Sequence, residues 1–153
     1  MTWILLDLNY TLIANSLEKK SPFTKQIEGE VYRQWLIELV KPFSTILITA
    51  RPYKHIAQTL QSIMDKTGWQ PDDAYFNEYN LPPAQAKETM MIDLIFPRHG
   101  EESPYLAIES NPKTRAMYAK YNIPSIFVED GVQWTSLPRL GTVPVTSGNL
   151  TIA

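Results

Sequence analysis

Short, almost wholly apolar runs recur along this chain, and each is followed by polar residues. Continuous apolar runs of this length are typical of strands that are buried on both faces of a parallel sheet. They predict strands at residues 3–8, 45–49, 105–108 and 125–128, with a weaker one at 74–76.

Amphipathic stretches separate these runs. Apolar residues recur at helical spacing from Ile27 to Leu39, and Pro42 is expected to end that helix. A second helix is expected from Pro52, a favourable residue for a first helical turn, to Gly68. Two more are predicted, from 83 to about 94 and from 112 to 121.

Strands that alternate with helices predict right-handed crossovers and a mostly parallel sheet. We therefore expect an α/β fold, a three-layer Rossmann-like sandwich without a large cap domain. No linker divides the chain, so residues 1–153 are expected to form a single domain. Residues 131–153 are interpreted as an irregular C-terminal tail with an edge strand near 142–145.

The amino-acid composition of the chain excludes some classes of site and makes others less favoured. The chain is 44% hydrophobic with a net charge of −2, which does not point to nucleic-acid or membrane binding as a strong basic excess would. It has no cysteine, so disulfides, thiolate zinc sites and cysteine nucleophiles are excluded. The first apolar run is too short for a signal peptide or a membrane span, and a cytoplasmic location is the expectation.

Polar residues whose side chains could take part in catalysis or binding lie where the predicted strands end. Asp7 ends the first strand, Thr49 the second and Glu109 the fourth, while Lys87 lies on an intervening helix. In open α/β sheets, ligands bind beyond the carboxyl ends of the strands. These side chains are therefore expected to lie together.

Four segments in order carry a family resemblance: DLNYTL, ILITARP, Lys87 and LAIES. Together they resemble the haloacid dehalogenase (HAD) superfamily of phosphohydrolases over about residues 3–130. The stretch LAIESNPKTRAMYAKYNIPSIFV is similar in layout to the phosphatase domain of phage polynucleotide kinase. The segments 12–45 and 50–86 are too short for a large cap, so the resemblance implies a capless member with an open site.

The resemblance implies a catalytic role for Asp7, the nucleophile that forms an aspartyl-phosphate. Lys87 would neutralise charge on Asp7 and on the phosphate. Mg²⁺ would be the cofactor, held by Asp7, Glu109, Ser110 and the backbone carbonyl of Asn9.

Substrate binding is assigned to residues close to these motifs. Thr49 would donate a hydrogen bond to a phosphoryl oxygen, and Arg51 and Thr11 are further candidates for contacting the substrate. The phosphorylated partner would be a small molecule or a nucleic-acid end, with nucleotide or polynucleotide phosphates favoured. A local basic rim would help to bind it, formed by Lys19, Lys20, Lys25, Arg51, Lys54 and Arg98.

Two positions depart from the family pattern. Asn9 stands where the family has the aspartate that protonates the leaving group and then deprotonates water, which an amide cannot do. Ser110 replaces the second member of an acidic pair. The chain is thus either a slow Mg²⁺-dependent phosphohydrolase or a lapsed domain that binds a phosphorylated ligand or protein without turnover.

Structural interpretations compete for several of these residues. Asp7 and Thr49 could serve only as caps, and Lys87 could be a solvated lysine with Lys113 as its competitor. The histidines lack the spacing of metal ligands and are expected at the surface, at positions 55 and 99. The tryptophans are expected to pack in the core, at positions 3, 35, 69 and 134.

Overall fold

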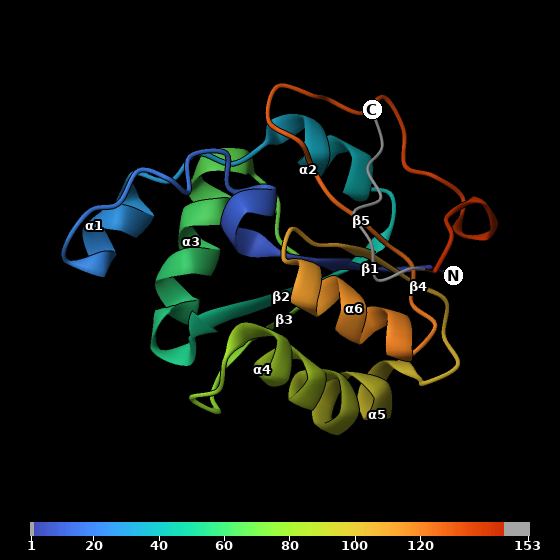
Figure 1. Ribbon diagram of the computed structural model, residues 1–153. Coiled ribbons are helices and arrows are strands. Elements are labelled where there is room, and N and C mark those ends of the chain that lie inside the picture. The colour runs from blue at the N-terminus through green and yellow to red at the C-terminus, as the bar shows by residue number, and fades with distance from the viewer. Residues whose placement is uncertain (1, 146–153) are drawn as a thin grey trace.

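The computed structural model describes residues 2–145 and has a five-stranded, all-parallel sheet at its centre (Figure 1). The strand order is β3-β2-β1-β4-β5, with β1 in the middle. The strands are β1 (Trp3–Leu6), β2 (Ser44–Pro52), β3 (Asp73–Asn77), β4 (Tyr105–Ile108) and β5 (Ser125–Ile126). The predicted α/β fold class is confirmed.

Helices cover both faces of this sheet (Figure 1). They are α1 (Phe23–Glu28), α2 (Gln34–Val40), α3 (Ile56–Thr67), α4 (Pro83–Met90), α5 (Phe96–His99) and α6 (Pro112–Lys120). Residues of α2 and α3 pack on one face, and residues of α4 and α6 pack on the other. A wide turn, Met91–Ile95, continues α4 into α5, much as the sequence predicts for the helix after Pro83.

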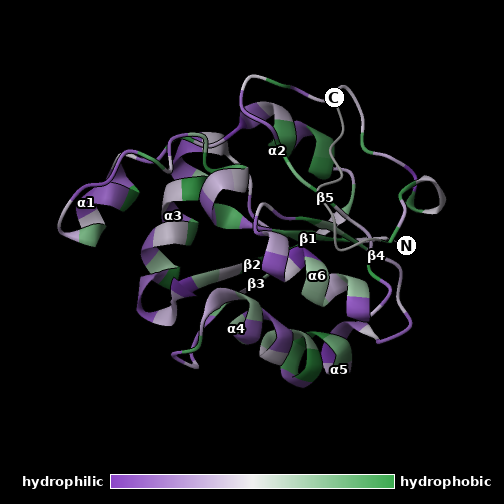
Figure 2. Ribbon diagram, in the orientation of Figure 1, coloured by the Kyte–Doolittle hydropathy of each residue, from purple (hydrophilic) through white to green (hydrophobic). Residues whose placement is uncertain are grey.

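The core is divided by the alternation of side chains along each strand. In β1, Ile4 and Leu6 belong to the cluster with α2 and α3, whereas Leu5 belongs to the cluster with α4 and α6. All three are buried, and full burial of such a side chain contributes about 1.5–3 kcal/mol. Both faces of β1 are apolar, and Figure 2 shows apolar residues recurring in bands along the covering helices.

The single helix predicted over 27–40 is interrupted, and only its second half is formed, as α2. Helix α1 ends at Glu28 and α2 begins at Gln34, and between them Tyr32 forms an antiparallel bridge with Ile13. The Asn15 side chain holds this loop by bonding the carbonyl oxygen of Gly29 and the amide of Val31, at 2.9 and 2.8 Å. These tertiary contacts outweigh the helical spacing of the apolar residues.

Other boundaries shift as well. Strand β2 continues to Pro52, and α3 starts at Ile56 only after a 3₁₀ turn over Tyr53–His55. Strand β5 has two of its four expected residues. The edge strand predicted at 142–145 is not formed: Leu140–Thr142 make a 3₁₀ turn, and Val143 packs into the core.

The rest of the expected tail, 146–153, lies outside the described residues. Within residues 2–145, no helix is long and apolar enough to cross a membrane. Trp69 and Trp134 are buried in the core, and Trp35 packs against Trp134 with ring centroids 5.5 Å apart, as expected.

Candidate active site

Of the four residues expected to lie together, Asp7, Lys87 and Glu109 are in contact at the carboxyl edge of the sheet, and Thr49 lies in the second half of β2. Lys87 on α4 reaches across to place its Nζ 2.8 Å from Asp7 Oδ1 and 2.5 Å from Glu109 Oε1. All three side chains are at most 8% exposed. Because both carboxylates contact one ammonium nitrogen, they lie well within the separation of about 8 Å beyond which one cation could not contact both. Lys113, the competing lysine, is exposed on α6.

A distorted turn after β1 presents Asp7. Within Leu8–Leu12, Asn9 is extended (ψ 136°) and Tyr10 has a φ of 63°, a left-handed conformation rare for a bulky residue. Such a conformation costs about 1–3 kcal/mol and persists only where the surroundings enforce it. Here the Ser16 hydroxyl accepts a 2.7 Å hydrogen bond from the Tyr10 amide, and Thr11 Oγ1 donates one of 2.7 Å to Asp7 Oδ2.

With both carboxyls ionised, the charges in this cluster would not balance, because two carboxylates would share one ammonium group. Burial alone would raise the pKa of Asp7, but the Lys87 charge and the hydrogen bonds to Asp7 outweigh it and hold that pKa below its ordinary value. Burial and the negative charge of Asp7 raise the pKa of Glu109 to about 8. The pKa of Lys87 is raised: burial would lower it, but the two carboxylates outweigh that effect. Asp7 is thus kept ionised, as a nucleophile requires.

Three oxygen atoms, from Asp7, Ser110 and the backbone of Asn9, are the candidate ligands for a divalent cation. Ser110 Oγ lies 3.1 Å from Asp7 Oδ2 and 3.5 Å from the backbone oxygen of Asn9. A carboxylate oxygen and a carbonyl oxygen thus both lie within 3.5 Å of the Ser110 hydroxyl, a set of hard oxygen donors that suits Mg²⁺ with several waters. Glu109 already accepts hydrogen bonds on each oxygen, from Lys87 and from the Asn111 amide. Among residues 2–145, no group of three or more His, Cys, Asp or Glu side chains could hold a metal.

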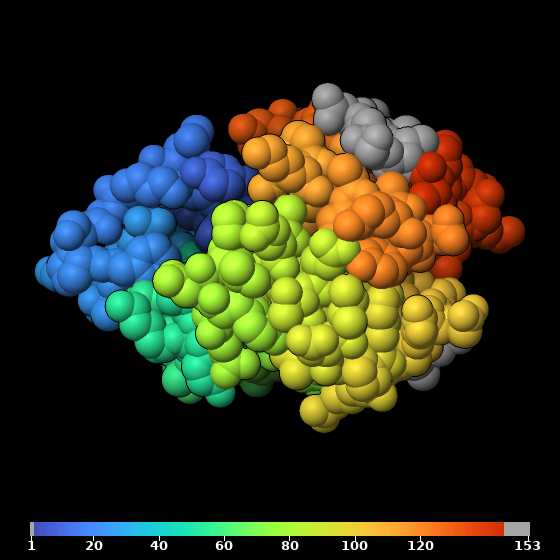
Figure 3. Space-filling model, turned by 60° about the horizontal axis from the view of Figure 1, so that its bottom comes forward, coloured from blue at the N-terminus to red at the C-terminus, as the bar shows by residue number. Residues whose placement is uncertain are grey.

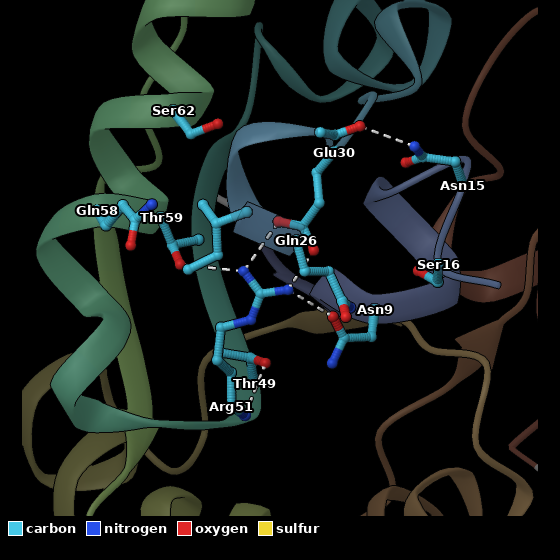
Figure 4. A network of polar contacts seen from close by, with 12 residues as sticks. Asn9, Asn15, Ser16, Gln26, Glu30, Thr49, Arg51, Gln58, Thr59 and Ser62 are labelled. Carbon is cyan, nitrogen blue, oxygen red and sulfur yellow. Dashed lines mark hydrogen bonds and ion pairs between the residues drawn. The ribbon is translucent and has the colours of Figure 1, made fainter. Parts of the chain in front are cut away.

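A second buried ion pair stands beside this cluster, between Arg51 and Glu30 (Figure 4). The guanidinium donates to both carboxylate oxygens of Glu30, at 3.0 and 2.5 Å, and to Thr59 Oγ1 at 3.0 Å. Its Nη2 also donates to Asn9 Oδ1 at 2.9 Å, and its backbone amide donates to Thr49 Oγ1 at 3.1 Å. Arg51 therefore links Glu30 to the turn that carries Asp7.

This pairing corrects two expectations about basic residues. Arg51 is 2% exposed, so its charge is directed at Glu30 and does not contribute to a surface rim. Arg98 pairs with Asp73, at the start of β3 and hence at the opposite edge of the sheet. The rest of the predicted rim is exposed, namely Lys19, Lys20, Lys25 and Lys54.

Two further assignments change. Thr11 is fully buried and donates its hydroxyl to Asp7 Oδ2, so it orients the Asp7 carboxylate instead of facing a substrate. His99, expected at the surface, packs its ring 4.3 Å from that of Trp3 and bonds Asp73 at 2.9 Å, with its side chain 9% exposed. His55 is half-buried and lies against Phe23. Neither histidine lies with the four strand-end residues.

Sequence reasoning missed Glu30. It is 3% exposed, although acidic residues are rarely buried without a partner. It lies within the stretch predicted to be helix, where a glutamate looks like an ordinary solvent-facing residue. No spacing signal connects it to Arg51, 21 residues later.

Open space adjoins the site. A cavity of about 610 Å³ borders Ser110 and is walled by Tyr10, Leu17, Arg33 and Phe127, with Glu129 among the other lining residues. Figure 3 shows a hollow between the N-terminal part of the chain, in blue, and the green segment around α4, with dark blue chain in its depth. No cap domain covers this edge in the described part of the chain.

Comparison of the chain with protein-family models, curated proteins and solved structures finds no match.

Proposed function

We propose that this protein is a Mg²⁺-dependent phosphohydrolase that cleaves a phosphate monoester through an aspartyl-phosphate on Asp7. The observation that carries the proposal is the buried Lys87 ammonium between Asp7 and Glu109 at the carboxyl edge of a parallel sheet. A carboxylate held ionised beside a fixed cation is suited to attack on phosphorus. The four-segment resemblance to the HAD superfamily points to the same chemistry.

The reaction would have two steps. An Asp7 oxygen attacks phosphorus, the bond from phosphorus to the ester oxygen breaks, and the leaving oxygen takes a proton from solvent water to give the alcohol. Water then attacks the phosphorus of the aspartyl-phosphate, inorganic phosphate is released and Asp7 is regenerated. Lys87 would neutralise charge on the phosphoryl oxygens and the Thr49 hydroxyl would donate a hydrogen bond to one of them, and such electrostatic support is the main task of the protein in phosphoryl transfer.

Mg²⁺ would be held by Asp7, the Asn9 carbonyl and Ser110, with Glu109 as a further candidate ligand. When bound, it would screen the negative charge of the phosphate. A single carboxylate among the three closest oxygens suggests modest affinity, completed by waters and by substrate oxygens.

The substrate class follows from the open edge. Four exposed lysines lie on the segments around the site, and they favour a nucleotide or polynucleotide phosphate. The cavity beside Ser110 has room for the leaving group, and its aromatic walls suit a ring. Glu129 and Asp130 on the same cavity disfavour a long polyanion there, so a mononucleotide-sized substrate fits best.

One observation favours a second candidate, a lapsed domain that binds a phosphorylated ligand or partner protein. The Asn9 side chain cannot exchange protons and is fixed by Arg51, so the turn offers no acid or base at that position. Such a domain would bind phosphate without hydrolysing the ester.

Turnover of p-nitrophenyl phosphate with and without Mg²⁺ separates the two candidates. We expect a burst of p-nitrophenol and an acid-labile phospho-enzyme that can be trapped, because the second step lacks a base for water. Asp7→Asn should abolish both, since an amide cannot form the acyl-phosphate. Full activity in Asp7→Asn would refute covalent catalysis at Asp7, and no phosphoryl transfer in the wild type would favour the binding domain.

A further inference from the structure

The carboxamide of Asn9 has only one workable orientation. Arg51 Nη2 lies 2.9 Å from one end of the amide, and a guanidinium can only donate hydrogen bonds. That end must be the oxygen, because the amide nitrogen would place two donors against each other. Asn9 Nδ2 then points away from Arg51, as Figure 4 shows, and it has no hydrogen-bond partner among residues 2–145.

Arg51 is itself held in place from several sides. Its guanidinium bonds both oxygens of Glu30 and the hydroxyl of Thr59, and the side chains of this ion pair are 0% and 3% exposed. The Phe23 ring lies 4.9 Å from the guanidinium carbon. A guanidinium fixed by this many contacts has little freedom to swing away, so the hydrogen bond to Asn9 is preorganised.

The direction of Asn9 Nδ2 matters because the residue belongs to the same turn as Asp7. The backbone oxygen of Asn9 faces Ser110, on the Asp7 side, while its side-chain oxygen faces Arg51. The N–H groups of Asn9 are thus a fixed donor on the turn that carries Asp7. A fixed donor suits an oxygen that carries lone pairs and negative charge, as in a phosphate dianion.

We infer that Arg51, locked by Glu30, is a positioning residue that turns the Asn9 amide nitrogen toward the ligand, so that Asn9 is a permanent hydrogen-bond donor to a phosphoryl oxygen. The inference rests on the proposed phosphate-binding role of this site but not on turnover. It gives a function to Asn9 at the position where the family has an aspartate: Asn9 would donate a hydrogen bond to the bound phosphate, whereas the aspartate exchanges protons.

Calorimetric titration with inorganic phosphate in the presence of Mg²⁺ tests the inference on the full chain. Asn9→Ala should weaken binding by about 10–100-fold, as expected for loss of a hydrogen bond to a charged group. Arg51→Lys keeps a charge for Glu30 but lacks the second nitrogen that reaches Asn9, and we expect a loss of about 3–30-fold.

The deciding measurement is a double-mutant cycle. If Arg51 acts through Asn9, Arg51→Lys should change phosphate affinity by less than about twofold in the Asn9→Ala background. Equal losses in both backgrounds would mean that Arg51 acts only through the general fold, and would overturn the inference. Glu30→Gln offers the same cycle if Arg51→Lys does not fold.

Thr59→Val is the matched control. It removes one hydrogen bond from the side of Arg51 away from Asn9, so it should lower stability while leaving phosphate affinity within about twofold. A wild-type protein that does not bind millimolar phosphate would refute the inference. Phosphate binding that depends on Asn9 without any phospho-enzyme would support it while refuting the hydrolase proposal.

Discussion

Two buried charge clusters lie on either side of the turn after β1, and they differ in stoichiometry. In the first, Lys87 serves two carboxylates, those of Asp7 and Glu109. In the second, Arg51 is paired only with Glu30; its Nη atoms also donate to the neutral Thr59 and Asn9, while its Nε is buried without a hydrogen-bond partner among the described residues. All five charged side chains are at most 8% exposed.

The difference in charge between the two clusters points to a structural role for the Arg51–Glu30 pair and a functional role for the Lys87 cluster. The balanced pair has every carboxylate oxygen opposite a donor, so it can brace the turn without changing its protonation. The unbalanced cluster keeps one carboxyl under electrostatic strain, visible as the pKa of Glu109 raised to about 8. Strongly shifted groups of this kind concentrate at functional sites, although structural networks also produce them. Asn9 joins the clusters, since its backbone faces one and its side chain the other.

The largest expected effect comes from making the second cluster resemble the first. Asn9→Asp adds a second carboxylate next to Arg51 and restores a group that can take a proton from water. The hydrolysis of the aspartyl-phosphate should accelerate by about 10²–10⁴-fold, and the burst should disappear. Pre-steady-state kinetics with p-nitrophenyl phosphate and Mg²⁺ measure both. An Asn9→Asp protein with an unchanged burst would show that another group activates water.

Replacing each of the two buried glutamates by glutamine should lower the free energy of unfolding by different amounts. Glu30→Gln leaves Arg51 as a buried charge without its counter-ion, which costs about 3–5 kcal/mol. Glu109→Gln leaves Lys87 paired with Asp7, so its cost should stay below about 1.5 kcal/mol. Urea denaturation at pH 7 compares the free energies of unfolding. Equal losses would mean that the imbalance of the first cluster has no energetic consequence.

A third prediction concerns the dependence of stability on pH. The pKa of Glu109 rises from an ordinary 4.5 to about 8 on folding, so its stabilising contribution is complete below pH 4.5 and is lost as the pH rises through 8. The lowered pKa of Asp7 acts oppositely: its contribution is present above pH 3.8 and is lost as the pH falls further. In metal-free protein, unfolding free energy should therefore decline between pH 4.5 and 8.

Glu109→Gln supplies the control for this decline, because it removes the titrating group and should flatten the curve. A wild-type profile that rises over the same range would contradict the raised pKa.

Local rules explain why much of the fold and the first cluster could be predicted. Buried parallel strands leave continuous apolar runs, and the residues that follow them meet at one edge because all the strands point the same way. Asp7 and Glu109 follow such runs directly, Thr49 closes one, and the geometry unites the first two with Lys87.

The second cluster follows no local rule. Glu30 sits in a loop between α1 and α2 that is formed by the Tyr32–Ile13 bridge and by the Asn15 side chain. Helical spacing of apolar residues continues across that loop, so the pattern cannot reveal the break. The burial of Arg51 depends on the same loop, which is why its guanidinium was expected at the surface.

The central place of β1 sets the order in which the chain can assemble. Its sheet partners, β2 and β4, begin at residues 44 and 105, so β1 is synthesised before both and must wait for them. Asp7 meets Lys87 across 80 residues and Ser110 across 103. High contact order of this kind slows folding, and an N-terminal fragment that ends before β4 would expose an unpaired edge of its central strand. Nascent chains should therefore require protection from aggregation until translation has passed Ile108.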